Sequence, residues 1–157
     1  MNHRNGIDGQ QVELMGTAAL TAALIREGFE IARPARDRGI DLIVFSDSDH
    51  FTALPIQVKT HTGSGFMVHR KDERFKSLVH ALVWNAQGKS PNLFLFTQKE
   101  AVALLPEGKA TKAYYSGSNG HWTWHKTPPK IADQLGAFAA ERRWDWLRAK
   151  LLLGTYC

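Results

Sequence analysis

Three polar side chains interrupt two short stretches of sequence that otherwise have the composition of buried strands. Asp41 lies in the stretch IDLIVF at 40–45, and Gln57 and Lys59 lie in PIQVKT at 55–60. Burying a carboxylate, an amide and an ammonium is unfavourable unless they meet partners or hold an ion. Because side chains alternate along a strand, Gln57 and Lys59 share one face and the apolar residues around them share the other. These three residues are therefore the first candidates for chemistry.

The connection between the two stretches is short and contains turn-forming residues, Ser46-Asp47-Ser48-Asp49. A hairpin of this length places Asp41 near Gln57 and Lys59. Mg²⁺ takes oxygen ligands, commonly one or two carboxylates with waters and phosphate oxygens. Asp41, the amide oxygen of Gln57 and the backbone carbonyl of Val58 are candidate metal ligands. Lys59 is placed to hold an attacking water or to neutralise charge that develops on a phosphate.

The elements that must position these residues follow an α/β order. Residues 10–27 carry a helical apolar stripe and end before Gly28, and a second helix is expected over 98–105, before Pro106. A Gly-rich segment, 116–120, predicts a hairpin between Tyr114-Tyr115 and the strand 121–125. Pro128-Pro129 opens a final helical region. The other expected strands are 29–32, 40–46, 53–61, 66–68 and the adjacent pair 78–84 and 92–96. This order predicts an α/β domain around one mixed sheet.

The stretch Gly39-Ile40-Asp41-Leu42-Ile43-Val44, followed by Ile56-Gln57-Val58-Lys59-Thr60, resembles the core signature of the PD-(D/E)XK nuclease superfamily. It is most similar to the Holliday-junction-resolvase-like and Mrr-like branch, where a Q-x-K form of the second motif occurs. The resemblance implies a restriction-endonuclease-like core, with a central mixed β-sheet flanked by helices. It implies one domain over 1–157, with the core at about 10–105 and the C-terminal hairpin and helices at about 106–157.

Carried over to this chain, the resemblance implies that Asp41, Gln57 and the Val58 carbonyl bind Mg²⁺ or Mn²⁺, with Lys59 as the catalytic lysine. In the superfamily a helix before the signature supplies a further acidic residue, which here is Glu13, a metal or water ligand. The implied activity is metal-dependent DNA endonuclease cleavage by a homodimer. Ile40 stands where the superfamily name has proline, and Gln57 replaces an acidic residue. The loss of that carboxylate leaves a second reading open: a catalytically disabled nuclease-fold module that binds DNA or another partner.

Basic residues flank both parts of the signature. The net charge is +5 and the pI is near 9.5, which favours an anionic partner. A solvated loop surface would explain the same charges, so this pattern alone does not decide. The residues expected to contact nucleic acid are Arg36, Arg38, His69, Arg70, Lys71 and Arg74.

The remaining signals mostly exclude functions. Cys157 is the only cysteine, which excludes an internal disulfide and a cysteine metal cluster within one chain. The N-terminus lacks an apolar signal core and no apolar run is long enough for a bilayer, so we expect a cytoplasmic protein with no membrane partner. No small-molecule cofactor beyond the metal is expected. His121 and His125 on one strand lie about 13 Å apart, too far to share a zinc ion. Trp122 and Trp124 are expected to cover a sheet face.

Overall fold

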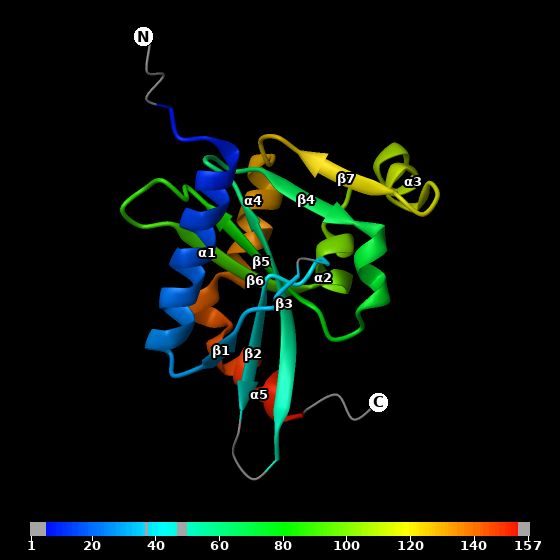
Figure 1. Cartoon of the computed structure of the whole chain (residues 1–157). Coiled ribbons are helices and arrows are strands. Elements are labelled where there is room, and N and C mark those ends of the chain that lie inside the picture. Colours follow the sequence, from blue (N-terminus) through cyan, green and yellow to red (C-terminus); the bar gives the residue numbers. More distant parts are fainter. Residues whose placement is uncertain (1–5, 37, 47–49, 154–157) are drawn as a thin grey trace.

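A five-stranded mixed sheet forms the centre of the computed structural model, which describes residues 6–36, 38–46 and 50–153 (Figure 1). The strand order is β1-β2-β3-β5-β6. Every neighbouring pair is antiparallel except β3 and β5, which run parallel. The bounds are β1 Glu30–Ala32, β2 Leu42–Ser46, β3 Thr52–Thr60, β5 Val79–Trp84 and β6 Asn92–Thr97. The expected α/β architecture with a central mixed sheet flanked by helices is confirmed.

The two strands of the signature form the expected antiparallel hairpin. Their register runs from Ser46 opposite Thr52 to Leu42 opposite Ile56. Residues 47–49 of the expected turn lie outside the described part of the chain, as does Cys157. β3 continues beyond Ile56 to Thr60, and there it pairs with β5 alone. The edge of β3 where β2 has ended is therefore open to the loop that precedes β2.

Helix α1, Gly9–Arg26, covers one face of the sheet together with α5, Trp144–Leu152 (Figure 1). Asp8 caps α1 in a reciprocal capping box with Gln11, which explains why the helix begins there. The apolar side chains of this face form one buried cluster. Its members from the two helices and the signature strands include Val12, Leu20, Leu24, Leu42, Val44, Leu54, Ile56, Val58, Leu147 and Leu151.

The opposite face is covered by a small second sheet and three short helices. Strand β4, Phe66–His69, pairs antiparallel with β7, His121–Trp124, and the one-turn helix η1, Arg70–Arg74, follows β4. The helices are α2 Gln98–Ala103, α3 Lys109–Tyr115 and α4 Pro129–Leu135. Trp122 and Trp124 pack against the second buried cluster, as expected.

The expected hairpin between Tyr114-Tyr115 and β7 is wrong. Tyr114 and Tyr115 end helix α3, and β7 pairs with β4 instead. Ala110 and Tyr114 are the buried residues of α3, and their spacing of one helical turn places both on the side that faces the core. The Gly-rich segment therefore connects a helix to a strand rather than two strands.

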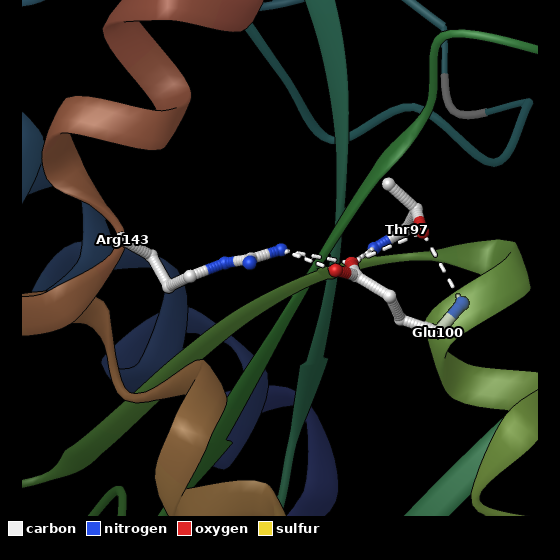
Figure 2. A network of polar contacts seen from close by, with 3 residues as sticks. All are labelled: Thr97, Glu100 and Arg143. Carbon is white, nitrogen blue, oxygen red and sulfur yellow. Dashed lines mark hydrogen bonds and ion pairs between the residues drawn. The ribbon is translucent and has the colours of Figure 1, made fainter.

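A polar network ties the C-terminal helical region to the start of α2 (Figure 2). Thr97 caps α2 and forms a capping box with Glu100. Both carboxylate oxygens of Glu100 also accept from Nη2 of Arg143 at 2.8 Å, and the Arg143 guanidinium lies 3.8 Å from the ring centre of Trp146. The final helical region is confirmed, in four pieces that begin at α4. The other three are η2 Gly136–Phe138, η3 Ala140–Arg142 and α5.

Within the described ranges, no helix is both long enough and apolar enough to cross a membrane.

Candidate functional site

Asp41 is held against β3 by two hydrogen bonds at the point where β2 begins. Gly39, with a φ of +88°, turns the chain into this position, a conformation that favours glycine. The Asp41 N–H donates to the carbonyl of Ile56 at 2.9 Å. Its carboxylate Oδ2 accepts from the Val58 N–H at 2.6 Å, where the next strand pairing would otherwise lie. The short bond fixes the carboxylate beside the segment that carries Gln57 and Lys59.

The Val58 carbonyl faces the same opening as the Asp41 carboxylate. In a strand, the N–H and C=O of one residue point toward the same edge. The Val58 N–H points toward Asp41, and β2 does not extend to this level of β3. The backbone oxygen proposed from the sequence as a metal ligand is therefore directed to the side of β3 where Asp41 lies.

Gln57 and Lys59 lie on the face of β3 opposite to α1. Ile56 and Val58 belong to the core beneath α1, so the alternating residues point to the other side. Gln57 is 3% exposed, and its Oε1 atom has no hydrogen-bond partner. Its neighbour across the parallel pairing is His80 on β5. A buried amide oxygen without a partner is unfavourable in a folded protein, which is the expected state of a ligand atom without its cation.

Two histidines near Lys59 are held neutral. Burial lowers the pKa of His80 to about 4, and the charge of Lys59 adds to this effect. Burial likewise lowers the pKa of His69 to about 4, helped by Lys59 and Lys71. At neutral pH the positive charge on this part of the sheet is therefore carried by Lys59 and not by the imidazoles beside it.

A buried carboxylate that the sequence reasoning missed belongs to the same region. Asp72 on η1 is 1% exposed, and neither of its carboxylate oxygens has a hydrogen-bond partner. Burial raises its pKa, Asp41 acts in the same direction, and the positive charge of Lys59 opposes both. The sequence RKDER at 70–74 has the composition of a solvated basic loop. It gives no sign that the central aspartate is buried.

Glu13 lies in a different environment. It is exposed on α1 and lines a surface hollow with Thr60, His61 and Thr62 at the end of β3. The buried side of α1 packs on the sheet face opposite to Gln57 and Lys59. Its role as a ligand stays a prediction.

The basic residues expected to contact nucleic acid divide into two groups. Arg70 donates through Nη1 to the carbonyls of Tyr115 and Gly117, and Arg74 donates to the carbonyl of Arg38 at 2.8 Å. These two arginines hold neighbouring loops in place. The side chains of Arg36, Arg38 and Lys71 are exposed, and His69 is half-buried.

The donor atoms near Asp41 fit a hard divalent cation. In the part of the chain that the structure describes, no group of three or more His, Cys, Asp or Glu side chains is placed to hold a metal ion. The Asp41 carboxylate nevertheless lies against Val58, and the neighbouring Gln57 carries an unpartnered amide oxygen. Oxygen ligands of these kinds suit Mg²⁺ or Mn²⁺.

The chain is similar in structure to a known nuclease. No protein-family model matches the chain, and no curated protein matches it. The fold is similar to that of Hjc, a Holliday junction resolvase from the archaeal hyperthermophile Archaeoglobus fulgidus. The match has 14% sequence identity and a TM-score of 0.42, and it covers 77% of this chain and 95% of the resolvase.

Proposed function

We propose that this protein is a metal-dependent DNA endonuclease of the PD-(D/E)XK type, from the Holliday-junction-resolvase-like and Mrr-like branch. The observation that carries the proposal is the 2.6 Å bond from the Val58 N–H to the Asp41 carboxylate. It brings the two halves of the signature together at the open edge of β3. The mixed sheet, with α1 before it and a parallel partner for β3, supports the same assignment.

In this proposal each polar residue of the signature has a separate task. Asp41, the Gln57 amide and the Val58 carbonyl hold Mg²⁺ or Mn²⁺, and Glu13 is a further candidate ligand. The bound cation would supply Lewis acidity and positive charge next to the scissile phosphate. Lys59 stands two residues from Gln57 on the same face, where its ammonium orients the attacking water and stabilises the negative charge that grows on the phosphate oxygens.

A second function, a disabled module that binds DNA or another partner, is favoured by one observation. Gln57 supplies a neutral oxygen where the superfamily has a carboxylate, which lowers the negative charge available to a cation. In the first function, we propose that the cation still binds at Gln57. Gln57 is 3% exposed and its amide oxygen has no hydrogen-bond partner, so the fold holds that oxygen in place for a cation.

Cleavage assays with Mg²⁺ or Mn²⁺ on duplex, single-stranded and four-way branched DNA test the first function. We expect cleavage that is abolished by EDTA and by Asp41→Ala. Glu107→Ala, at an exposed position before α3, serves as a matched loss of one carboxylate. If none of these substrates is cut by wild type, and Gln57→Glu does not restore cleavage, the disabled-module function replaces the enzyme.

We also propose that DNA is the partner and that two copies act together, because cutting both strands requires two sites. Light scattering on the purified protein, alone and with branched DNA, measures the number of copies.

A further inference from the structure

The buried carboxylate of Asp72 lacks the partners that a structural role would require. An ionised carboxylate removed from water is strongly unfavourable unless it is paired or binds a metal. Asp72 is 1% exposed, both oxygens lack hydrogen-bond partners, and no ion pair within 4.0 Å involves it among the described residues. It does not cap η1 either, because the helix begins after His69 with no side-chain cap, and Phe75 binds the backbone carbonyl of Asp72.

The helix η1, which carries Asp72, is fixed beside residues 38–41, the Asp41 loop that precedes β2. Arg74 donates to the carbonyl of Arg38 at 2.8 Å. A Cβ atom built on Gly39 would lie 3.6 Å from Nε2 of Gln57 and 3.7 Å from Nη2 of Arg74. Gly39 therefore lies close to both the Gln57 amide and the Arg74 side chain at the end of η1. Asp72 lies within electrostatic reach of the cations Lys59, Lys71 and Arg74 and of the carboxylate of Asp41.

Two carboxylates near one another repel unless a cation lies between them. Asp41 raises the pKa of Asp72, so the two carboxylates lie within electrostatic reach of one another, and the buried Gln57 of β3 supplies an oxygen that has no hydrogen-bond partner. Gln57 stands where the superfamily has an acidic residue, so the site has one negative charge fewer. An ionised Asp72 carboxylate would supply that missing negative charge. A site with two carboxylates, an amide and a backbone carbonyl meets the usual preference of Mg²⁺ for one or two carboxylates.

We propose that Asp72 is the second carboxylate ligand of the divalent-cation site that Asp41 and Gln57 begin, in place of the acidic residue that Gln57 replaces. The proposal rests on the proposed function, since it adds a residue to the same site. The second carboxylate would come from η1, and Glu13 of α1 stays a further candidate ligand. Asp72 belongs to η1, which follows β4 in the connection between the parallel strands β3 and β5. The proposed second carboxylate therefore lies outside the two strands that carry Asp41 and Gln57.

The test measures Mn²⁺ binding to the metal-free full chain by calorimetry, without DNA. We expect Asp72→Asn to weaken Mn²⁺ binding at least tenfold, as Asp41→Asn should, whereas Glu107→Gln, which removes an exposed carboxylate before α3, leaves the affinity within twofold. Without metal, Asp72→Asn should melt at the same temperature as wild type or higher, because an unpaired buried charge has been removed. The double variant Gln57→Glu, Asp72→Asn should regain most of the lost affinity.

The outcomes separate this proposal from the proposed function. Weak binding in Asp41→Asn with unchanged binding in Asp72→Asn overturns the role of Asp72 and leaves the nuclease site intact. Unchanged binding in both variants overturns the metal site itself. A measurement on wild type alone guards against a variant that does not fold: substoichiometric Mn²⁺ should broaden the backbone amide resonances of Asp41 and Asp72. Broadening at Asp41 without broadening at Asp72 overturns the inference.

Discussion

At the scale of single residues, the site is built from polar atoms that the fold leaves without partners. Gln57 Oε1 and both carboxylate oxygens of Asp72 are buried without hydrogen bonds, although such groups are almost always satisfied in native proteins. Each unsatisfied group destabilises the fold by about 1–3 kcal/mol. Gln57 is adjacent to Val58, which binds the Asp41 carboxylate, and Asp72 lies within electrostatic reach of Asp41. The proposed cation site would give these atoms the partner that they lack.

Substitutions at Lys59 and Gln57 should affect the cleavage rate and the metal affinity separately. Lys59→Ala removes positive charge that acts mainly as charge accumulates on the phosphate, so we expect a rate about 10²–10³ lower with little change in Mn²⁺ affinity. Gln57→Glu adds a carboxylate of nearly the same reach and should tighten Mn²⁺ binding. Single-turnover cleavage and calorimetry measure the two effects. Equal loss of rate and affinity in Lys59→Ala would contradict the assigned role.

His80 should make the metal-free protein sensitive to acid. Burial, with Lys59 and His69 nearby, lowers its pKa from 6.5 in the unfolded chain to about 4 in the folded chain. Between these values the unfolded state holds more protons, so the free energy of unfolding should fall as the pH is lowered from 6.5 to 4. His69 contributes in the same direction, whereas the raised pKa of Asp72 opposes it.

Urea unfolding in EDTA at several pH values measures this dependence. His80→Leu should flatten the slope in that window because the titrating group is gone. An identical slope in wild type and His80→Leu would show that His80 is not the residue responsible.

At the scale of elements, the sequence predicts what depends on local pattern. The existence of helix α1, the alternation of Gln57 with Val58 and the pairing of β2 with β3 follow from local pattern, and each was confirmed. The expected apolar stripe of α1 was wrong in part, because Gly16, Leu20 and Leu24 are buried in place of Met15, Ala19 and Ala22. The pairing of β7 with β4 depends on contacts between distant segments. The burial of Asp72 depends on how η1 is held in the fold, for example by the bond from Arg74 to the carbonyl of Arg38, which no pattern within 70–74 encodes. The missed part of the candidate site is therefore the part supplied by the connection between β3 and β5.

The position of α1 depends on a close contact that only glycine permits. A Cβ atom on Gly16 would lie 2.2 Å from Oγ1 of Thr60 on β3, closer than real side chains approach. Gly16→Ala should therefore destabilise the protein by about 1–3 kcal/mol, despite the better helix propensity of alanine.

Adding Thr60→Ala to Gly16→Ala removes the two nearest atoms and should recover part of the loss. Chemical denaturation of both variants measures the coupling between the positions. Additive effects of the two substitutions would show that α1 and β3 do not meet as described. Gly28→Ala, which places a side chain at a φ of +82° with open space around it, is a control for backbone strain alone.

At the scale of the whole molecule, the two faces of the central sheet serve different purposes. One face carries a continuous apolar cluster beneath α1 and α5, and that cluster supplies stability. The other face has its own apolar cluster under β4, β7 and the short helices, but Gln57, Lys59 and His80 occupy part of the same surface. These three polar side chains lie beside a packed core and therefore have little freedom to move, which favours a preorganised site.

The basic surface around this polar group should determine how DNA affinity depends on salt. Phosphate contacts release counterions, and each contact contributes about 0.9 to the slope of log affinity against log salt for duplex DNA. Arg36 and Lys71 are exposed, whereas Arg70 and Arg74 bind backbone carbonyls and hold loops in place. The double variant Arg36→Ala, Lys71→Ala should therefore flatten the slope without changing the melting temperature.

The matched control also removes one arginine and one lysine, but from elsewhere on the surface. Arg26 at the end of α1 and Lys89 between β5 and β6 are both exposed, and Arg26→Ala, Lys89→Ala should leave the slope as in wild type. Fluorescence anisotropy with a labelled duplex in EDTA, over a range of salt concentrations, measures binding without cleavage. Equal flattening in the two double variants would mean that DNA responds only to the net charge of +5. A flatter slope in the Arg36→Ala, Lys71→Ala variant alone would instead indicate that the DNA backbone runs across η1 and the loop that precedes β2.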